Sequence, residues 1–172
     1  VAGGGFDQCY NAQAAVATGS LLIVANGLTQ AANDKQQLKA LIDKLKELPR
    51  KLGRVKRVLA DSGYLSEANV EHCAAAKIEP LIAMKRERHN ARWKERFAED
   101  PKAPAASASV MQQMAHRLKT QRGKKLYALR KQTPEPVFGI IKSVMGFRQF
   151  LLRGFESAKG EWNLVTMSWN IR

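Results

Sequence analysis

The sequence predicts an α/β fold, and three observations support this class. Short apolar runs at residues 55–60 and 78–84 alternate with stretches of helical periodicity, an order typical of a largely parallel sheet with flanking helices. Two extended runs at residues 10–16 and 21–28 are joined by Thr18-Gly19-Ser20, which indicates a leading antiparallel hairpin. Hydrophobic residues make up 45% of the 172 residues, enough for a sizeable core. The expected order is β-β-α-β-α-β.

The helices of the first half follow from caps and apolar spacing. Asn33 or Asp34 is expected to cap the helix after the hairpin, with Gln36 or Gln37 as the capping-box partner. This helix should end at about residue 49, and its apolar face consists of Leu38, Leu41, Ile42, Leu45 and Leu48. Ser66 is expected to cap the next helix, between the two short strands.

Beyond residue 84 the pattern becomes more charged. We expect a charged helix over residues 86–99, a Pro/Ala/Ser linker over residues 100–109 and a helix over residues 110–119, with Gly123 breaking the pattern. Thr133 should cap a helix that runs to Gly146, and a closing helix over residues 161–171 should place Trp162 and Trp169 in the core rather than against bases.

These patterns suggest three parts. Residues 1–85 would form the core with the hairpin and both short strands, residues 86–126 a basic helical insertion with its linker, and residues 127–172 the C-terminal helices.

A strong positive charge favours a polyanionic partner. Lys and Arg number 29 against 15 Asp and Glu, which gives a net charge of +14 and an isoelectric point near 10.1. Nucleic acid is the leading candidate and an acidic membrane surface the alternative. No apolar run approaches the roughly 20 residues that span a bilayer, and no secretory signal opens the chain.

Most of this charge comes from one stretch. Residues 85–131 hold 14 Lys and Arg but only four acids, so they contribute +10 of the +14. The stretch either follows the phosphates of a nucleic acid or is a solvated helix surface. The two cysteines, Cys9 and Cys73, form no CxxC pair and have no second ligand cluster, so a reduced, cytoplasmic chain without a metal-thiolate site is expected.

Two acids stand out within this basic sequence. Asp61 ends the predicted strand at residues 55–60, where functional groups of parallel sheets gather, and Glu135 opens a helix, where the dipole favours an anion. Carboxylates in such places are the parts from which metal-dependent phosphodiester chemistry is built. The alternative is that Asp61 is only a turn residue and Glu135 only a helix-start acid.

Several motifs in order resemble bacterial insertion-sequence transposases with a DDE catalytic domain. They are GFDQCYNAQAAV at residues 5–16, AND at 32–34, LADSGY at 59–64 and EPVFGIIK at 135–142, extended by GFR at 146–148, LRG at 152–154 and EWNL at 161–164. The similarity covers nearly the whole chain, and ordered motifs are far more specific than single ones.

The resemblance implies an RNase H-like mixed sheet with flanking helices. Its three acids would hold two divalent ions, Mg²⁺ or Mn²⁺, for cleavage at transposon ends and strand transfer into double-stranded target DNA. Asp61 matches the second acid and Glu135 the third, so both are expected to be catalytic metal ligands. The likeness also implies DNA contacts for Tyr127, Arg130 and Lys142, and a homo-oligomer in the DNA complex is compatible with it.

The sequence departs from the family pattern in three places. Four residues separate Arg130 from Glu135 where the common signature has three, so either Lys131 takes the arginine's place or this subgroup differs. Asp7 does not match the first acid, whose strand would precede the hairpin and lie between it and the Asp61 strand. Ala17 stands where many relatives carry an acid, and we interpret that position as structural.

A chain that starts at Val1 without the first catalytic strand is expected to be a fragment. Two sheet edges would then face a gap, which predicts marginal stability or aggregation and an inactive fragment. The alternative function is a catalytically inactive remnant that only binds DNA through its basic stretch.

Overall fold

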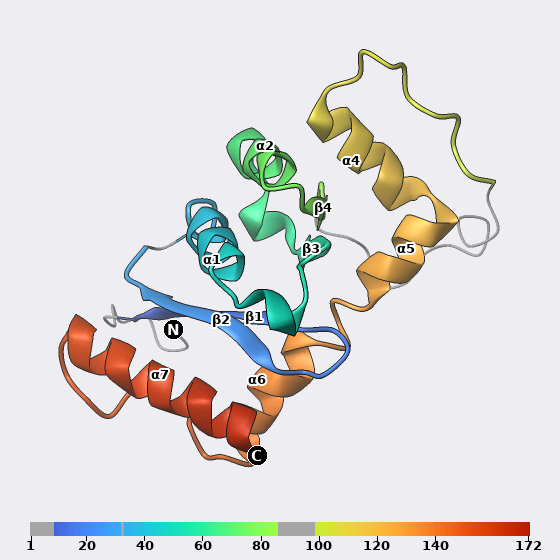
Figure 1. Cartoon of the computed structure of the whole chain (residues 1–172). Helices are drawn as coiled ribbons and strands as arrows, with labels where there is room; N and C mark the ends of the chain where they lie inside the picture. The colour runs from blue at the N-terminus through green and yellow to red at the C-terminus, as the bar shows by residue number, and fades with distance from the viewer. Residues whose placement is uncertain (1–8, 32, 86–98) are drawn as a thin grey trace.

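A computed structural model of the chain describes residues 9–31, 33–85 and 99–172. Figure 1 shows a two-stranded hairpin in the middle, with helices on both sides of it and a further pair of helices to one side. The expected order of the first six elements, β-β-α-β-α-β, is confirmed. The expected helix over residues 86–99 lies almost entirely outside the described residues.

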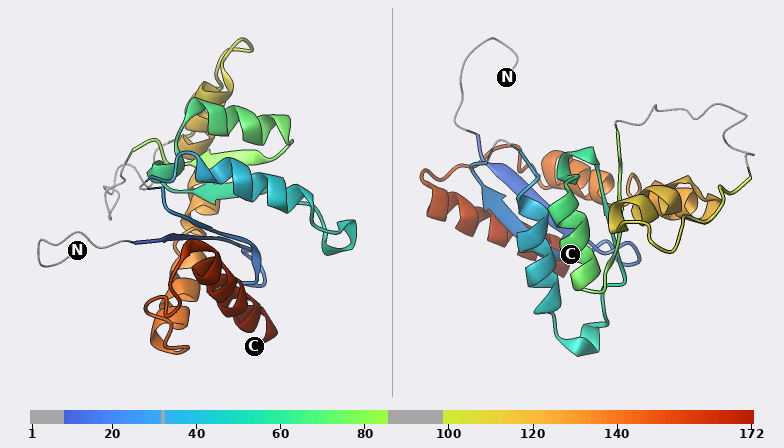
Figure 2. Two further views of the ribbon diagram at one scale, coloured as in Figure 1. Left: turned by 90° about the vertical axis from the view of Figure 1, so that its left-hand side faces the viewer. Right: turned by 90° about the horizontal axis from the view of Figure 1, so that it is seen from above.

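The leading hairpin consists of β1 (Asn11–Val16) and β2 (Ile23–Thr29). The strands pair antiparallel from Asn11 opposite Thr29 to Val16 opposite Ile23, with an irregularity in register at Ala15 and Val16. In Figure 2 the hairpin lies between α1 on one side and α6 with α7 on the other, so both of its faces are covered.

The second sheet is parallel and equally small. β3 (Arg57–Ala60) pairs with β4 (Glu79–Ile82), with Arg57 opposite Glu79. The crossover between these strands contains the short 3-10 turn η2 (Ser62–Tyr64) and α2 (Glu67–Ala75). Ser66 caps α2 as predicted, because its Oγ accepts a hydrogen bond from the Asn69 amide at 3.2 Å.

The described residues therefore form two sheets of two strands rather than one continuous mixed sheet. Among residues 9–31, 33–85 and 99–172, β1 pairs only with β2 and β3 only with β4, and residues of β1 and β3 line a shared cavity of about 470 Å³. Its lining includes Ala14 to Val16 of β1 and Arg57 to Leu59 of β3. In the described part of the chain, each of these strands thus keeps one backbone edge without a strand partner.

The first helix differs from its predicted start. α1 (Gln37–Lys46) begins after Gln36, which makes no side-chain capping bond, and neither Asn33 nor Asp34 caps it. Asp34 contributes only its backbone carbonyl, which accepts from the Gln37 amide at 3.0 Å. The side chain of Asp34 turns back toward β1, where its Oδ1 accepts hydrogen bonds from the side-chain amides of Asn11 and Gln13. A short 3-10 turn, η1 (Arg50–Leu52), follows Pro49.

Helices α4 (Val110–Lys119) and α5 (Gln121–Ala128) form an arm beside β4. A capping box of Ser109 and Gln112 begins α4, and Thr120 caps α5. The prediction that Gly123 breaks the helical pattern is wrong, because Gly123 lies inside α5, where it comes close to the carbonyl of Arg117.

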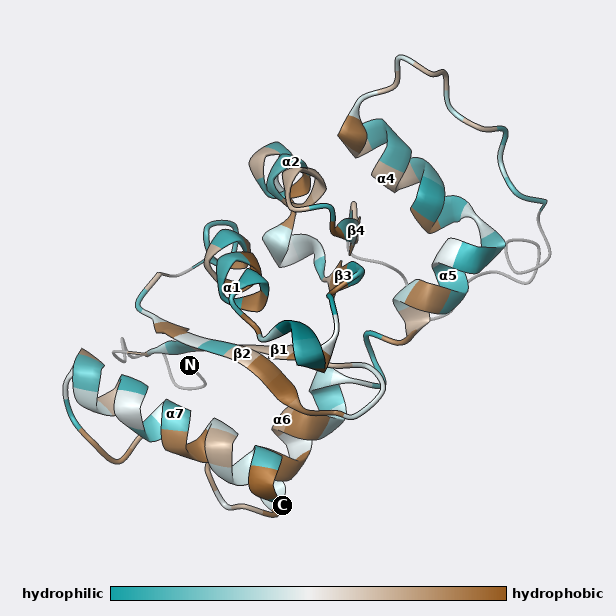
Figure 3. Cartoon of the chain, in the orientation of Figure 1, coloured by the Kyte–Doolittle hydropathy of each residue, from teal (hydrophilic) through white to brown (hydrophobic). Residues whose placement is uncertain are grey.

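The C-terminal part contains α6 (Pro134–Ser143) and α7 (Phe155–Ile171), the latter starting six residues earlier than predicted. Thr133 precedes α6, but its hydroxyl donates to the Leu129 carbonyl at 2.6 Å instead of capping the helix. Trp162 is 2% exposed and packs with Val137, Ile141 and Ile23, so its expected place in the core is confirmed. Figure 3 shows α6 mostly brown and α4 mixed in hydropathy.

A second core cluster lies on the other side of the hairpin. It joins α1, α2 and α4 through buried residues that include Leu38, Ile42, Val70, Cys73 and Met114. Burial of a single such side chain stabilises the fold by about 1.5–3 kcal/mol. The two clusters therefore stabilise the packing of helices against both faces of the hairpin.

Candidate active site

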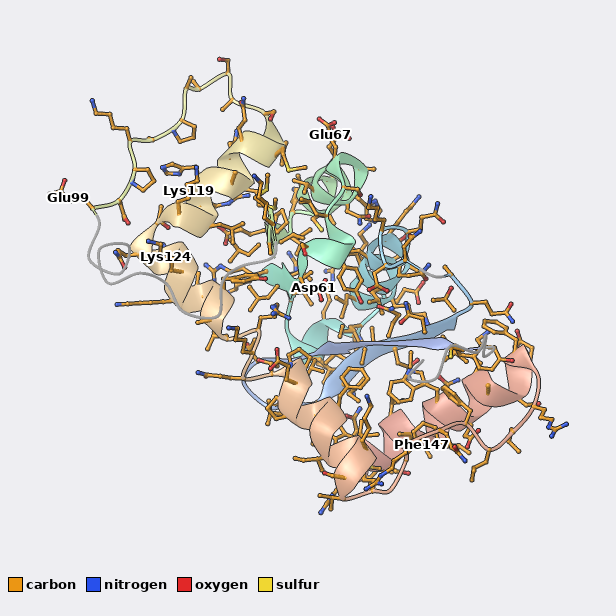
Figure 4. All side chains as sticks on the ribbon, turned by 180° about the vertical axis from the view of Figure 1, so that it is seen from behind. Asp61, Glu67, Glu99, Lys119, Lys124 and Phe147 are labelled. Carbon is orange, nitrogen blue, oxygen red and sulfur yellow. The ribbon has the colours of Figure 1, made fainter. Side chains whose placement is uncertain are left out.

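Asp61 follows β3 directly and lies near the middle of the molecule (Figure 4). Its backbone is extended, and its Oδ1 accepts a hydrogen bond from the Gly63 amide at 2.9 Å, which begins η2. The carboxylate is exposed. Asp61 is thus a turn residue, as one interpretation of the sequence held, and it also presents an accessible carboxylate at the carboxyl end of a parallel strand.

A second carboxylate, which the sequence did not suggest as a site residue, lies beside Asp61. The Oδ1 of Asp34 accepts from Asn11 Nδ2 at 2.6 Å and from Gln13 Nε2 at 2.8 Å. A Cβ built on Gly63 would stand 3.0 Å from Asp61 Oδ1 and 3.4 Å from Asp34 Oδ2. Both carboxylates therefore lie close to Gly63.

Tyr64 completes this polar cluster. Its hydroxyl donates to Gln13 Oε1, and Gln13 is 5% exposed. Burial raises the pKa of the Tyr64 phenol above its ordinary value, and the negative charges of Asp34 and Asp61 raise it further. The phenol is therefore a neutral hydrogen-bond donor across the physiological pH range.

Glu135 occupies the first turn of α6, at the positive end of the helix dipole. Its Oε1 lies 3.9 Å from Arg130 Nη2, and the carboxylate side chain is 61% exposed. The guanidinium of Arg130 in turn lies 5.7 Å from the ring centroid of Tyr127. Three residues that the sequence singled out are thus neighbours.

Tyr127 connects this group to the Asp61 strand. Its hydroxyl donates to the Ala60 carbonyl at 3.2 Å, one residue before Asp61, and the side chain is buried. Lys131 and Lys142 are both exposed, with Lys142 in the last turn of α6. The two predicted metal ligands bind different groups: Asp61 accepts a hydrogen bond from the Gly63 amide, and Glu135 forms an ion pair with Arg130.

A family model of the transposase DDE domain matches residues 2–171. The chain belongs to this family. The match confirms the assignment to insertion-sequence transposases that act in DNA recombination, and membership implies an RNase H-like fold. Searches among curated proteins and among solved structures find no match.

DDE domains generally use divalent metal ions, so the donors of this chain can be tested against that chemistry. Carboxylate oxygens are the hard ligands that Mg²⁺ and Mn²⁺ prefer, and Asp61, Asp34 and Glu135 supply them. Within residues 9–31, 33–85 and 99–172, however, no three His, Cys, Asp or Glu side chains gather closely enough to hold a metal ion together. The donor type fits, and the described part of the domain supplies an incomplete set.

The neighbours His72 and Cys73 have ordinary structural places in α2. Cys73 is fully buried in α2, while the neighbouring His72 lies 3.0 Å from Asp43 Oδ1. In the described parts of the chain, no helix is long and apolar enough to cross a membrane.

Proposed function

We propose that this DDE domain cleaves DNA at transposon ends and transfers the cut strand to target DNA, with Asp61 and Glu135 as catalytic metal ligands. The observation that carries the proposal is the position of Asp61, an exposed carboxylate at the carboxyl end of β3 in a chain of this family. Bound divalent ions would activate the attacking oxygen and stabilise the leaving oxygen.

The chain's own residues would position these ligands. Gly63 holds Asp61 through its amide, which fixes one carboxylate oxygen and leaves the group accessible. Arg130 lies beside Glu135, with its Nη2 3.9 Å from Glu135 Oε1, and can hold the carboxylate in place. Tyr127 fixes the backbone just before Asp61 through the Ala60 carbonyl.

We further propose that a strand bearing the third carboxylate completes the sheet between β1 and β3. The cavity supports this, because residues of both strands line it and each strand pairs on one edge only among the described residues. Its lining is apolar at Val24, Leu45 and Leu59 and basic at Arg54 and Lys56, so an inserted strand would find both packing partners and positive charge. Addition of such a strand would join the two small sheets into the mixed sheet expected of the family.

DNA binding by the basic stretch belongs to the same proposal. Exposed cations of α4, α5 and the following turn would contact phosphates, namely Lys119, Arg122, Lys125 and Lys131, and Lys142 of α6 would extend the surface. Because each neutralised phosphate releases counterions, affinity should fall steeply between 50 and 200 mM salt, by roughly 10³-fold for about six contacts. A flat salt profile in a fluorescence anisotropy titration would show that these side chains only face solvent.

The catalytic proposal is tested by Asp61→Asn and Glu135→Gln in a protein that includes the additional strand. Either change should abolish end cleavage, because it removes a metal-binding charge, while DNA affinity changes little. Glu67→Gln is a suitable control, since Glu67 is exposed on α2. Cleavage at a near-normal rate in either mutant would refute the assignment.

The incomplete ligand set keeps a second candidate function open to test, a remnant that binds DNA without cleaving it. Under this alternative, the wild-type protein with the additional strand would show salt-dependent DNA binding but no cleavage with Mg²⁺ or Mn²⁺. Cleavage by the wild-type protein excludes it.

A further inference from the structure

We infer that the last turn of α7 masks a strand-pairing surface on the outer edge of β2, and that β2 of a second copy of this chain is the strand this surface accepts. The outer edge is the side of β2 away from β1, where no strand pairs with it among the described residues. The inference involves neither metal nor DNA, so it stands or falls separately from the proposed function.

Asn170 of α7 binds β2 as a neighbouring strand would. The Ile23 amide donates to Asn170 Oδ1 at 2.8 Å, and Asn170 Nδ2 donates to the Ile23 carbonyl at 2.8 Å. In an antiparallel sheet, two opposite residues exchange the same pair of hydrogen bonds through their main chains. The side-chain amide of Asn170 therefore occupies the place of a residue from a third strand.

Further side chains from two helices bind along the same part of the hairpin. Lys44 Nζ of α1 donates to the Asn26 carbonyl at 2.6 Å, and Asn26 Nδ2 donates to Thr166 Oγ1 at 2.6 Å. The Trp169 indole donates to the Leu21 carbonyl at 2.8 Å, two residues before β2 begins. Figure 1 shows α7 lying along the hairpin, in agreement with these contacts. The outer edge of β2 is thus covered by hydrogen-bonding side chains rather than by a strand.

The hairpin itself has no charge that would keep other strands away. The sequence holds no Asp, Glu, Lys, Arg or His between Asp7 and Asp34, and β2 contains no proline. Natural proteins protect exposed strand edges with charged side chains or proline, or cover the edge with a helix. Since β2 lacks the first two, its outer edge depends on the cover that α7 and Lys44 supply.

The mask is open enough to be displaced. Asn170 is exposed, and a groove of about 420 Å³ lies between β2 and α7, lined by residues that include Ile23 to Asn26 and Met167. Exposed apolar side chains continue on the same helix, at Leu164, Met167 and Ile171. A strand that replaces Asn170 would therefore find both main-chain partners and apolar surface.

A second copy of β2 has the chemistry that fits this surface. A net charge of +14 makes two copies repel each other, so they approach most readily where the surface is uncharged. Neither β2 nor residues 162–171 of α7 contain a charged side chain. Antiparallel pairing of two identical strands about a two-fold axis also lets the donor and the acceptor of Ile23 serve in both directions.

The first test compares the self-association of three chains by sedimentation velocity over a concentration series. Asn170→Ala removes both bonds to Ile23 and should raise the association constant at least about 10-fold, because an incoming strand no longer competes with Asn170. Asn163→Ala is the matched control and should behave as the wild-type chain, since Asn163 is exposed two turns earlier on the same helix. Association through the edge of β1 is common to all three chains and cancels in the comparison.

Two further measurements assign the association to β2. Leu22→Lys, added to Asn170→Ala, should restore wild-type behaviour, because Leu22 is 42% exposed beside the edge and like charges on an edge oppose strand pairing. The same added charge at Leu151, which is exposed in the loop before α7, should leave the association raised. In dilute solution, hydrogen exchange of the Ile23 amide should be roughly 10-fold faster in Asn170→Ala than in the wild-type chain.

The opposite results overturn the inference. Equal association of Asn170→Ala and the wild-type chain would do so, as would an increase that Leu22→Lys leaves in place. If Asn170→Ala alters the circular dichroism spectrum, Asn170→Asp replaces it, because a carboxylate still accepts from the Ile23 amide and loses only the bond to the carbonyl. Asn170→Asp should then associate more strongly than Asn163→Ala, and equal association would again overturn the inference. The cleavage assay of Asp61→Asn judges the proposed function separately.

Discussion

Replacing Gly123 by alanine should destabilise the arm formed by α4 and α5, although alanine favours helices. A Cβ at this position would lie 1.7 Å from the carbonyl oxygen of Arg117, 2.7 Å from its carbonyl carbon and 3.0 Å from Thr120 Oγ1. Ordinary van der Waals contact begins at twice the first distance, and the obstacle is backbone that cannot rotate away. Overpacking of this kind costs about 1–3 kcal/mol and more where backbone must move, against about 1 kcal/mol gained from helix propensity.

We therefore expect a net loss of about 2 kcal/mol in the free energy of unfolding, seen in a urea titration followed by circular dichroism. Gly139 of α6 and Gly160 of α7 provide matched controls, because a Cβ at either position meets nothing within 4 Å. Alanine at these two positions should stabilise the chain by up to about 1 kcal/mol. Equal effects at all three glycines would refute the argument that Gly123 is required for the close approach of α5 to Arg117.

Two further predictions concern titratable side chains. Burial raises the pKa of the Cys73 thiol to about 11, so a thiol reagent at neutral pH should label the exposed Cys9 in the native chain and label Cys73 only after unfolding. Rapid native labelling of both cysteines would contradict the buried position of Cys73. The pKa of Tyr64 is raised above its ordinary value of 10.0, chiefly by burial, so its contribution to stability is complete below pH 10 and is lost as the pH rises further. Tyr64→Phe should make the alkaline loss of stability shallower than in the wild-type chain, as thermal unfolding at a series of pH values would show.

Much of the local structure could be predicted from the sequence, because it depends on neighbours along the chain. The apolar spacing of Leu38, Leu41 and Leu45 gave the buried face of α1, and the hydroxyl of Ser66 predicted the start of α2. The same holds for Asp61, whose place at the end of a short apolar strand follows from residues 57–61 alone. The ordered motifs predicted the family, which the domain match confirmed.

The errors have long-range causes. Asp34 is a good helix cap by its position in the sequence, but Asn11 and Gln13, more than 20 residues away, compete for its side chain and bind it. Gly123 looks like a helix breaker until the Arg117 carbonyl is seen beside it, where only a residue without a Cβ fits. The residues next to Asp34 and Gly123 in the sequence do not predict these distant contacts.

The sequence by itself determined the order of strands and helices from β1 to β4, the family, and the positions of Asp61 after a strand and of Glu135 at the start of a helix. Only the tertiary structure decided which carboxylates meet, placing Asp34 beside Asp61 and Arg130 beside Glu135, and dividing the strands into two small sheets. The physical reason is that helix periodicity and capping act within a few residues, whereas side-chain hydrogen bonds and strand pairing depend on how distant segments pack.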